Sequence, residues 1–490
     1  AWLDPDHYED VTPYSNPDES PYDYYAVGHT STSIALATGM AKARDLMGKH
    51  ENIMALIGDG SMTGGLAYEG LNNAAIEKHN LVVVVNDNQM SIDDNVGGLV
   101  TALKKLRDSN GETKENPFTA MGFDYRYVAD GNDIQSMIDA FKAVKNVDHP
   151  ILLHINTLKG KGYQPAIDNE EAHHWVMPFD LKTDKTTVAM PEGPTASSIA
   201  LDVLEDHINN GEKIMAINAA IPGVFGLDRI KNKYPENYHD VGIAEQESVA
   251  FAAGMAKEGA TPVLFENSTF LQRAFDQLSH DVAANDLPVV MMVAGGGISG
   301  TSKTHLGVFD QVMISNLPNW IYLAPTNLAE EKAMMEWAIK QKKHPVAIKM
   351  PTKGVPEGKE ITAVDYSEIK YDIKPGKDVA VLALGDMYDM LGKKVAEKTG
   401  ASLVNPVSAN ILDTAALDKL AQENKVIVTI EDNILDGGFG EKVASYLGDK
   451  DIKVLNYGQK RVYTDQVPLK EILKDNRMTV DQIVEDIENA

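Results

Sequence analysis

The chain contains no cysteine among its 490 residues. Disulfides, thiolate metal ligands and cysteine nucleophiles are therefore excluded, although this absence fits either side of a membrane. Basic residues are also scarce, because 45 Lys and Arg stand against 72 Asp and Glu and leave a formal net charge of −27. Phosphate backbones and anionic lipid surfaces repel a chain of this charge. We therefore expect neither nucleic acid nor a membrane surface as a partner.

Long apolar runs are missing as well. The longest purely aliphatic run is LVVVV at 81–85, whereas a membrane-spanning helix needs about 20 apolar residues. No signal-peptide pattern opens the chain, so we expect a cytoplasmic protein. The sequence begins with Ala1 rather than Met, which indicates a fragment or a processed form.

Short apolar runs alternate with helical patterns along most of the chain, as is typical of βαβ units with parallel sheets. Two stretches rich in proline and glycine, 160–195 and 350–377, interrupt this alternation and are interpreted as linkers. We therefore predict an α/β chain of three domains with mainly parallel sheets, at 1–181, 196–350 and 378–490. The expected strands are 53–57, 81–85, 151–155, 214–218, 262–265, 289–293, 320–324, 346–348, 379–384 and 426–430.

Polar side chains follow two neighbouring expected strands. Gly-Asp-Gly occupies 58–60 after the first, and Asn-Asp-Asn occupies 86–88 after the second. The ends of parallel strands meet at one edge of a sheet, where such folds bind ligands. The glycines allow the backbone to approach a phosphate. Oxygen atoms of Asp59 and Asn88 are the ligands that Mg²⁺ prefers. The spacing therefore predicts a diphosphate–metal site.

Six segments together resemble a known family. They read GHTSTS at 28–33, GDGSMT at 58–63, NDNQMSI at 86–92, DVGIAEQ at 240–246, STFLQRAFDQ at 268–277 and THLGVFD at 304–310. In this order, over nearly the whole chain, they resemble 1-deoxy-D-xylulose-5-phosphate synthase, a branch of the transketolase superfamily. The resemblance implies a transketolase-like fold that binds thiamin diphosphate and Mg²⁺.

The resemblance also implies roles for individual residues. Asp59, Asn88 and the carbonyl of Met90 match the metal ligands. Glu245 matches the glutamate that protonates the aminopyrimidine ring and favours its imino tautomer, for which the carboxyl needs a buried apolar site. Phe270 matches the aromatic ring that stacks on the pyrimidine. The cofactor-binding positions are His29, Gly58, Asp59, Gly60, Ser61, Asn88, Lys159, Glu245, Phe270 and Arg273.

Three histidines join Glu245 as expected catalytic residues. His29 and His305 match active-site histidines of the family. His174 matches a linker histidine that folds back over the site, although the adjacent His173 leaves this assignment open.

The sequence departs from the family pattern where the acceptor phosphate is bound. Gly295 and Thr352 stand where the family has two arginines. A bound phosphate would therefore lose two bidentate contacts with guanidinium groups. Lys303 or Lys353 could substitute as point charges. The family also has a longer segment before Gly28, which supplies further histidines, so either the chain is a fragment or another chain supplies them.

Three functions therefore remain open. The first is decarboxylation of pyruvate and condensation with an aldehyde, glyceraldehyde 3-phosphate by family default, in isoprenoid and thiamin biosynthesis. The second is transketolase-like ketol transfer, or the use of an unphosphorylated acceptor. The third is a non-catalytic paralogue that acts by binding. The resemblance further implies a homodimer. In the last domain, the acidic stretch 431–433 is expected to be a solvated loop.

Overall fold

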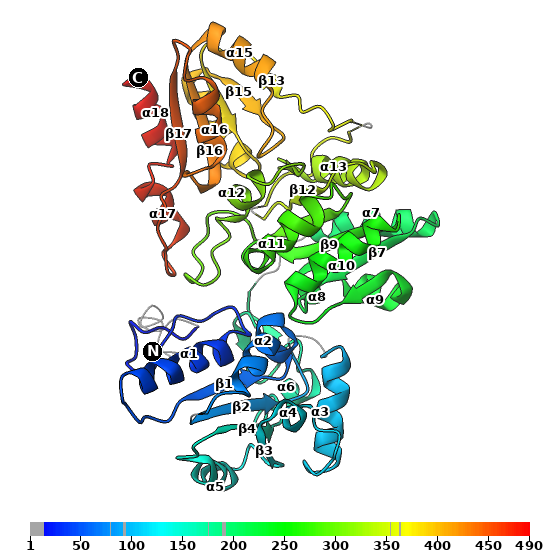
Figure 1. Cartoon of the computed structure of the whole chain (residues 1–490). Helices are drawn as coiled ribbons and strands as arrows, with labels where there is room; N and C mark the ends of the chain where they lie inside the picture. The colour runs from blue at the N-terminus through cyan, green and yellow to red at the C-terminus, as the bar shows by residue number, and fades with distance from the viewer. Residues whose placement is uncertain are drawn as a thin grey trace.

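The computed structural model describes residues 14–490 except 79, 92–94, 175, 189–192, 353 and 362–363. Lys353, one of the two candidate phosphate contacts, lies outside the described residues. Figure 1 shows three α/β units that follow one another along the chain, from blue and cyan through green to orange and red. Within the described residues, no helix is long and apolar enough to cross a membrane.

The first unit is built on a parallel four-stranded sheet of order β1-β2-β4-β3. Its central strands, β2 and β4, are mainly apolar, and the first five residues of each are buried, as expected for a parallel sheet covered on both faces. The apolar sides of α1 and α2 form one core with the sheet, and α5 joins a second. The elements are α1 (Ser33–Leu46), β1 (Met54–Gly58), α2 (Gly65–Ala74), β2 (Leu81–Asp87), α3 (Gly98–Asp108), α4 (Pro117–Met121), β3 (Asp124–Val128), α5 (Ile134–Val144) and β4 (Pro150–Asn156).

The second unit contains a fully parallel six-stranded sheet of order β11-β12-β10-β9-β7-β8. The stretch 160–195 that precedes it holds α6 (Gln164–Asp168) and a small hairpin of β5 (Phe179–Asp180) and β6 (Lys185–Thr186). The elements of the unit are α7 (Ala196–Asn209), β7 (Ile214–Asn218), α8 (Pro222–Phe225), α9 (Asp228–Lys233), β8 (Tyr238–Asp240), α10 (Glu245–Lys257), β9 (Thr261–Asn267), α11 (Phe275–Gln277), β10 (Val290–Ala294), α12 (Asp310–Ser315), β11 (Ile321–Leu323), α13 (Leu328–Lys340) and β12 (Val346–Lys349).

The third unit has a five-stranded sheet of order β13-β15-β14-β16-β17, in which only β13 runs antiparallel. Its elements are β13 (Asp372–Lys374), β14 (Asp378–Ala383), α14 (Lys393–Thr399), β15 (Ser402–Asn405), α15 (Thr414–Glu423), β16 (Asn424–Ile434), α16 (Phe439–Tyr446), β17 (Lys453–Gln459), α17 (Leu469–Asp475) and α18 (Val480–Glu488). Short 3-10 and π segments complete the chain: η2 (Gly60–Thr63), η3 (Pro235–Asn237), η4 (Phe270–Ala274), η5 (Leu278–Ala283) and η6 (Tyr388–Gly392).

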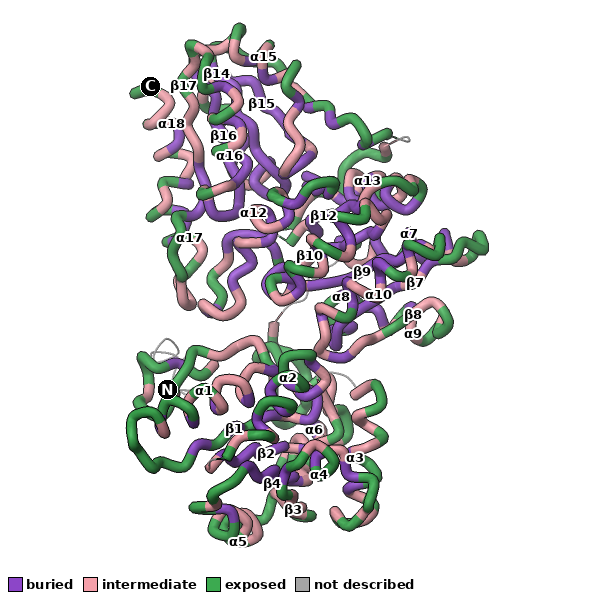
Figure 2. Tube along the Cα trace, viewed as in Figure 1, coloured by how far each residue is buried: buried purple, intermediate pink, exposed green. Residues whose placement is uncertain are grey.

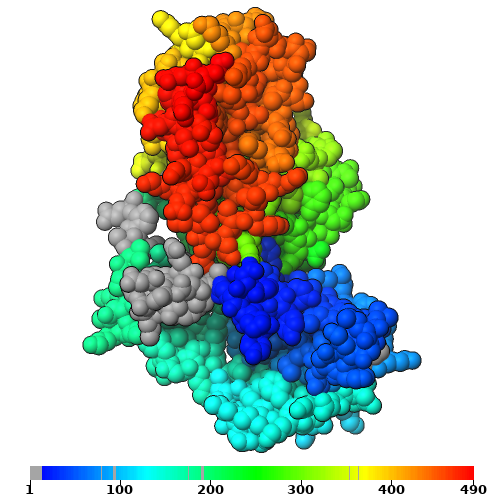
Figure 3. Space-filling model, turned by 90° about the vertical axis from the view of Figure 1, so that its left-hand side faces the viewer, coloured from blue at the N-terminus to red at the C-terminus, as the bar shows by residue number. Residues whose placement is uncertain are grey.

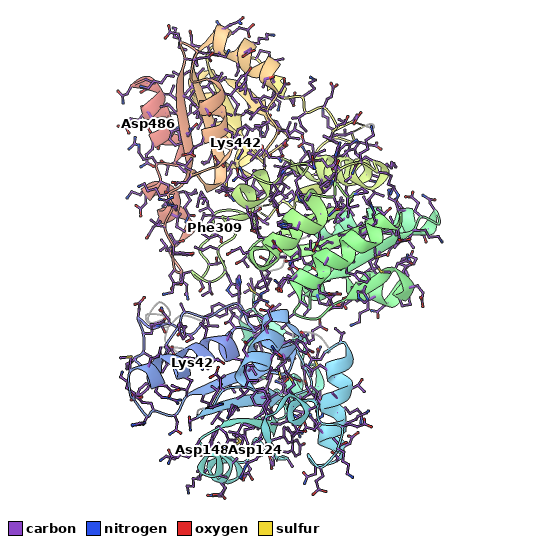
Figure 4. The ribbon with its side chains drawn as sticks, in the orientation of Figure 1. Lys42, Asp124, Asp148, Phe309, Lys442 and Asp486 are labelled. Atoms are coloured by element: carbon purple, nitrogen blue, oxygen red, sulfur yellow. The ribbon has the colours of Figure 1, made fainter. Side chains whose placement is uncertain are left out.

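The second and third units share their hydrophobic cores. Tyr322 of β11 and Val404 of β15 belong to one continuous cluster, and Phe309 packs against the core of the third unit. The central strands of both sheets are buried, as Figure 2 shows, and Phe309 lies beside α12 where the two units meet (Figure 4). These two units therefore pack as one body.

The α/β fold with mainly parallel sheets is confirmed, whereas the expectation for 431–433 is wrong. These residues belong to β16 and are fully buried. Asp432 pairs with the buried ammonium of Lys349, and Gln311 donates to Glu431 over 2.8 Å. The sequence pattern misled because a run of acidic residues is usually solvated, whereas here partners from the second unit neutralise it. The boundaries at 1–181, 196–350 and 378–490 stay a prediction.

Candidate active site

The predicted site residues gather where the first unit meets the second. On one side lie the loop before α1 and the turn after β1, and on the other lie the start of α10 and the turn after β9. Several contacts join the sides, two of them through the backbone. Thr63 Oγ1 accepts a hydrogen bond of 2.9 Å from the backbone N–H of Ile243. At Gly28, a Cβ would lie 2.1 Å from Thr304 Oγ1, so only glycine fits this approach.

Asp59 lies at the carboxyl end of β1 and is 2% exposed. Its Oδ2 accepts from the backbone of Gln89 at 2.7 Å and from Asn95 Nδ2 at 2.8 Å. The other carboxylate oxygen, Asp59 Oδ1, and the amide oxygen of its partner, Asn95 Oδ1, are both buried without a hydrogen-bond partner. Burial, and next the charge of Asp87, raises the pKa of Asp59 to about 7. Buried oxygens of this kind need a cation or a donor, so the residues fit Mg²⁺. Asn95 was missed by sequence reasoning.

Asn88 and Met90 complete the predicted metal motif. Asn88 follows β2, and its Oδ1 accepts a hydrogen bond of 3.1 Å from the backbone N–H of Met90. Among the described residues no three His, Cys, Asp or Glu side chains group as metal ligands. The candidate donor set is therefore one carboxylate with amide and carbonyl oxygens, the set of hard ligands that suits Mg²⁺.

Asp87, directly before Asn88 in the sequence, has a structural role that the sequence did not reveal. It is fully buried, and its Oδ2 lies 2.5 Å from Arg107 Nη1 and 2.8 Å from His154 Nε2. Burial opposes ionisation, but hydrogen bonds from His154 and Arg107 lower the pKa of Asp87. The anchored carboxylate also accepts from the backbone of Gln89 at 3.2 Å, which fixes the turn that carries Asn88.

Glu245 and Arg273 form an ion pair at the opposite end of the site. Glu245 begins α10 and is 3% exposed, and Arg273 Nη1 donates to its Oε2 over 2.9 Å. Arg273 Nη2 also donates to the backbone carbonyl of Thr30 at 2.5 Å. Glu266 on β9 is fully buried nearby, and its Oε2 has no hydrogen-bond partner. Burial, and then the charge of Glu245, raises the pKa of Glu266 well above its usual value. Sequence reasoning missed Glu266.

An aromatic cluster lies next to this ion pair. The rings of His29 and Phe270 meet edge-on with centroids 5.1 Å apart, and His305 lies 5.5 Å from His29 and 5.6 Å from Phe270. Tyr14 stacks on His305 at 4.5 Å. His29 Nε2 is hydrogen-bonded to Thr269 Oγ1 at 3.0 Å. Burial, followed by the charges of His305 and Arg273, lowers the pKa of His29 to about 4, and burial lowers that of His305. Both imidazoles are therefore neutral near pH 7.

Lys159 and His174 approach the metal end from the segment after β4. Lys159 Nζ donates to the carbonyl of Ser91 at 2.6 Å and lies 3.2 Å from His174 Nδ1. Ser91 in turn lies against Gly60, where a Cβ would come within 2.6 Å of it. His173 instead binds Asp184 in the hairpin, at 2.9 Å. The geometry therefore favours His174 over His173 as the linker histidine of the site.

Ser61 and Gly58 complete the predicted cofactor cradle. The carbonyl of Ser61 accepts a hydrogen bond of 2.7 Å from Ser31 Oγ, which ties the start of α1 to η2. A Cβ at Gly58 would lie 3.7 Å from Ser61 Oγ, an ordinary contact. The turn after β1 is therefore tied to the start of α1.

A cavity of about 590 Å³ opens beside His305. The first described residues, the second unit and the segment before α17 all contribute to its wall. Its lining residues are Tyr14, Asn267, Thr269, Gly295, Gly296, Gly297, Ile298, Ser299, Gly300, Thr301, Ser302, His305, Thr352 and Gln466. Figure 3 shows the last elements of the chain, in red and orange, directly above the first described residues in blue.

Three family models match the chain in succession. The model of 1-deoxy-D-xylulose-5-phosphate synthase matches 6–115 and 109–157, the transketolase pyrimidine binding domain matches 193–357, and the transketolase C-terminal domain matches 368–483. A 1-deoxy-D-xylulose-5-phosphate synthase of Geobacter sulfurreducens is 36% identical over 96% of this chain and 80% of its own length. One from Clostridium perfringens is 36% identical over 88% of this chain and 76% of its own.

The chain belongs to the 1-deoxy-D-xylulose-5-phosphate synthase family. Among solved structures, a split-gene transketolase described as an inactive β4 tetramer matches with a TM-score of 0.54 and 24% identity, over 61% of this chain and 98% of its own. That likeness supports the transketolase fold alone. Family membership confirms the prediction of a transferase of the transketolase class that depends on thiamin diphosphate. The roles of individual residues stay predictions.

Proposed function

We propose that the chain catalyses the decarboxylation of pyruvate and the transfer of the remaining two-carbon unit to an aldehyde, with thiamin diphosphate and Mg²⁺ bound between the first two units. The observation that carries the proposal is the pairing of two half-sites across one seam. Asp59 and Asn95 offer unpartnered buried oxygens on one side, and Glu245 lies buried against Arg273 on the other.

Each half-site suits one end of the cofactor. Asp59, Asn88 and the carbonyl of Met90 would hold Mg²⁺ against the diphosphate, and Lys159 would add a positive charge there. The Phe270 ring would stack on the pyrimidine, and the Glu245 carboxyl would hydrogen-bond a ring nitrogen. When bound, thiamin diphosphate supplies the carbon nucleophile and the electron sink for decarboxylation.

The remaining residues would handle protons and orientation. His29 and His305 are neutral near pH 7, so each offers one ring nitrogen that accepts a proton and one that donates. Thr269 orients the His29 ring through Nε2, and Tyr14 packs over His305. Both histidines can therefore exchange a proton with a substrate carbonyl or hydroxyl without first losing a charge. His174, beside Lys159, would shield the diphosphate end from water.

The decisive experiment measures carbon dioxide released from pyruvate by the purified chain with thiamin diphosphate, Mg²⁺ and an aldehyde. Release that requires all four components supports the proposal. Glu245→Gln should abolish release while calorimetry still detects cofactor binding. The matched control is Glu236→Gln, an exposed residue of η3. Unchanged release in Glu245→Gln, or none in the parent chain, would contradict the proposal.

Two further points belong to the same proposal. We propose that the chain works as a homodimer, which sedimentation would test, and that it resides in the cytoplasm. Family membership supports these proposals.

A further inference from the structure

We infer that Asp310 and Asn433 position the His305 imidazole, so that the third unit sets the geometry of the cavity beside it. Neither residue lines this cavity, and both act through the segment 304–310, which carries His305. The inference rests on the proposed function, because it assigns positioning residues to the same site. It depends on the packing of this segment against the cavity wall, on its burial in the third unit, and on a buried polar network at its end.

The segment 304–310 packs tightly against the glycines that follow β10. The backbone N–H of Gly297 donates to the carbonyl of Gly307 at 2.6 Å, and the two residues form an isolated antiparallel bridge. A Cβ at Gly307 would lie 1.9 Å from the carbonyl oxygen of Gly295, so this approach requires glycine. Gly295 and Gly297 line the cavity, and His305 stands just before Gly307 in the chain. The position of the segment therefore determines both the wall and the place of the imidazole.

The middle of this segment is buried in the core of the third unit. Leu306 is 2% exposed and Val308 is fully buried, and both belong to the hydrophobic cluster that contains residues of β14 and β16. The carbonyl of Val308 accepts a hydrogen bond of 3.3 Å from the backbone N–H of Ile434, the last residue of β16. The third unit therefore holds the residues that directly follow His305, although these residues come after β10 of the second unit.

Asp310 ends the segment and begins α12, and its carboxylate is fully buried. Asn433 Nδ2, from β16, donates to its Oδ1 at 3.2 Å, and the hydroxyl of Tyr322, from β11, donates to its Oδ2. A Cβ at Gly296, in the cavity wall, would lie 3.2 Å from that same Oδ2. Buried polar groups with satisfied hydrogen bonds are held rigidly. The carboxylate therefore fixes the end of the segment against the back of the wall.

Lys349 supplies the positive charge of this network. It ends β12 and is 3% exposed, and its ammonium pairs with Asp432 of β16. Its Cε would lie 3.4 Å from a Cβ at Gly296. Burial opposes the charge of Lys349, but the carboxylates of Asp432 and Asp310 raise its pKa. The ammonium therefore compensates carboxylates of the second and third units in one buried space behind the wall.

A further carboxylate of the third unit reaches the same wall. Asp386 follows β14 and is 4% exposed, and its Oδ2 accepts from the backbone N–H and the hydroxyl of Thr352 at 3.1 and 3.0 Å. Thr352 lines the cavity, and the charge of Asp386 acts on the Lys349 ammonium. The neighbouring strands β14 and β16 therefore both lead to the back of the cavity.

The test variant is Asn433→Leu, which removes the amide that donates to Asp310. Its matched control is Asn405→Leu. Asn405 on β15 is also buried, and its Nδ2 donates to a carboxylate of the second unit, Glu330 Oε1, over the same 3.2 Å. Neither Asn405 nor Glu330 lines the cavity. We expect both variants to lose comparable stability in chemical denaturation, because each leaves a carboxylate with one donor fewer.

The first measurement observes His305 without any turnover. In the full chain with isotope-labelled histidine, His305→Asn identifies the NMR signal of this ring. We expect Asn433→Leu to shift that signal and to weaken the magnetisation transfer between His305 and Tyr14, whose rings stack at 4.5 Å. His239, which stacks on Phe251 at the same centroid distance, should stay unchanged and is the internal reference. An unshifted His305 signal in Asn433→Leu, or an equal shift in Asn405→Leu, would overturn the inference.

The second measurement compares the kinetics of the holoenzyme with pyruvate and an aldehyde. Asn433→Leu should lower kcat at least about tenfold, because displacing a group that exchanges protons with the substrate slows the reaction. Calorimetry should give an unchanged Kd for thiamin diphosphate, and Asn405→Leu should keep the parent kcat. Asn433→Ser, which removes the amide without adding apolar bulk, replaces Asn433→Leu in both measurements if the leucine variant does not fold. The parent kcat in either folded Asn433 variant would overturn the inference. Absence of carbon dioxide release by the parent chain would refute the proposed function alone, because the NMR comparison requires no turnover.

Discussion

Arg273 donates through Nη1 to Glu245 Oε2 over 2.9 Å, within the second unit, and the same side chain reaches across to the first unit. The other end of the guanidinium holds the carbonyl of Thr30. One side chain therefore neutralises a buried carboxylate and ties the loop before α1 to the second unit. The position of the carboxylate that is expected to act on the cofactor therefore depends on a contact between the two units.

The first prediction concerns this ion pair. Arg273→Leu leaves Glu245 buried and uncompensated, so we expect the free energy of unfolding to fall by about 3 kcal/mol. Arg273→Lys should lose less stability, because lysine keeps the positive charge although it cannot bind both partners through a planar guanidinium. Chemical denaturation checks both values. The control is Arg229→Leu, whose partly exposed pairs with Asp202 and Glu205 should be worth about 1 kcal/mol or less. Equal losses at both positions would contradict the prediction.

The second prediction concerns the metal cradle. Asp59→Asn removes the only carboxylate of the predicted donor set, so Mg²⁺-dependent binding of thiamin diphosphate should weaken at least about tenfold. Titration calorimetry with and without a chelator provides the measurement. Asn95→Ala should weaken binding less, because Asn95 also orients Asp59 through its amide. Asp372→Asn, on the exposed edge strand β13, serves as the matched control, and an equal effect there would argue against a metal role for Asp59.

The third prediction concerns pH. The pKa of His29 is lowered to about 4, chiefly by burial, from an ordinary value of 6.5. Between these two values the unfolded chain binds a proton at this position that the folded chain does not. Stability should therefore fall as the pH drops from about 6.5 toward 4, by at most about 1.4 kcal/mol per pH unit from this group. NMR titration of the ring tests the pKa itself.

His149 provides the internal reference for that titration. A hydrogen bond that its ring donates to Asp148 raises the pKa of His149, so its ring should titrate with a midpoint well above that of His29. In His29→Asn, the part of the acid destabilisation that arises from this ring should disappear. A titration midpoint for His29 close to that of His149 would show that the His29 ring is not buried away from solvent, and would contradict the prediction.

The fourth prediction concerns Glu266. Burial raises the pKa of this carboxyl well above its usual value of 4.5, so the folded chain keeps a proton that the unfolded chain releases. Stability should consequently fall as the pH rises above about 4.5. Glu266→Gln, which cannot ionise, should remove that part of the slope between pH 5 and 8. Denaturation curves at several pH values provide the measurement, and an unchanged slope would indicate an ionised Glu266.

The fifth prediction concerns the pair of Gly295 and Asn267. Gly295→Ala should lower the free energy of unfolding by about 1 to 3 kcal/mol, since φ is positive and the new Cβ would crowd Asn267. Adding Asn267→Ala should restore only the steric part of the loss, because the backbone strain remains. Purely additive effects of the two substitutions would show that they do not contact each other.

Much of the fold follows from local sequence pattern. The run 81–85 predicted β2 because a strand covered on both faces needs continuous apolar residues. The strands β3, β8, β13, β15 and β17 were not predicted, since they are short or carry polar residues. The acidic stretch 431–433 was misjudged because its partners, Lys349 and Gln311, are distant in the sequence.

The sequence by itself determined the α/β class, the family, and the residue types at both ends of the site, because these depend on local periodicity and on short motifs. Only the tertiary structure decided that Arg273 holds Glu245, that Asn95 joins Asp59, and that His174 rather than His173 approaches Lys159. It also decided that Asp386 lies behind Thr352. Such pairings join residues far apart in the chain, and their energies depend on distance and burial, which local patterns do not encode.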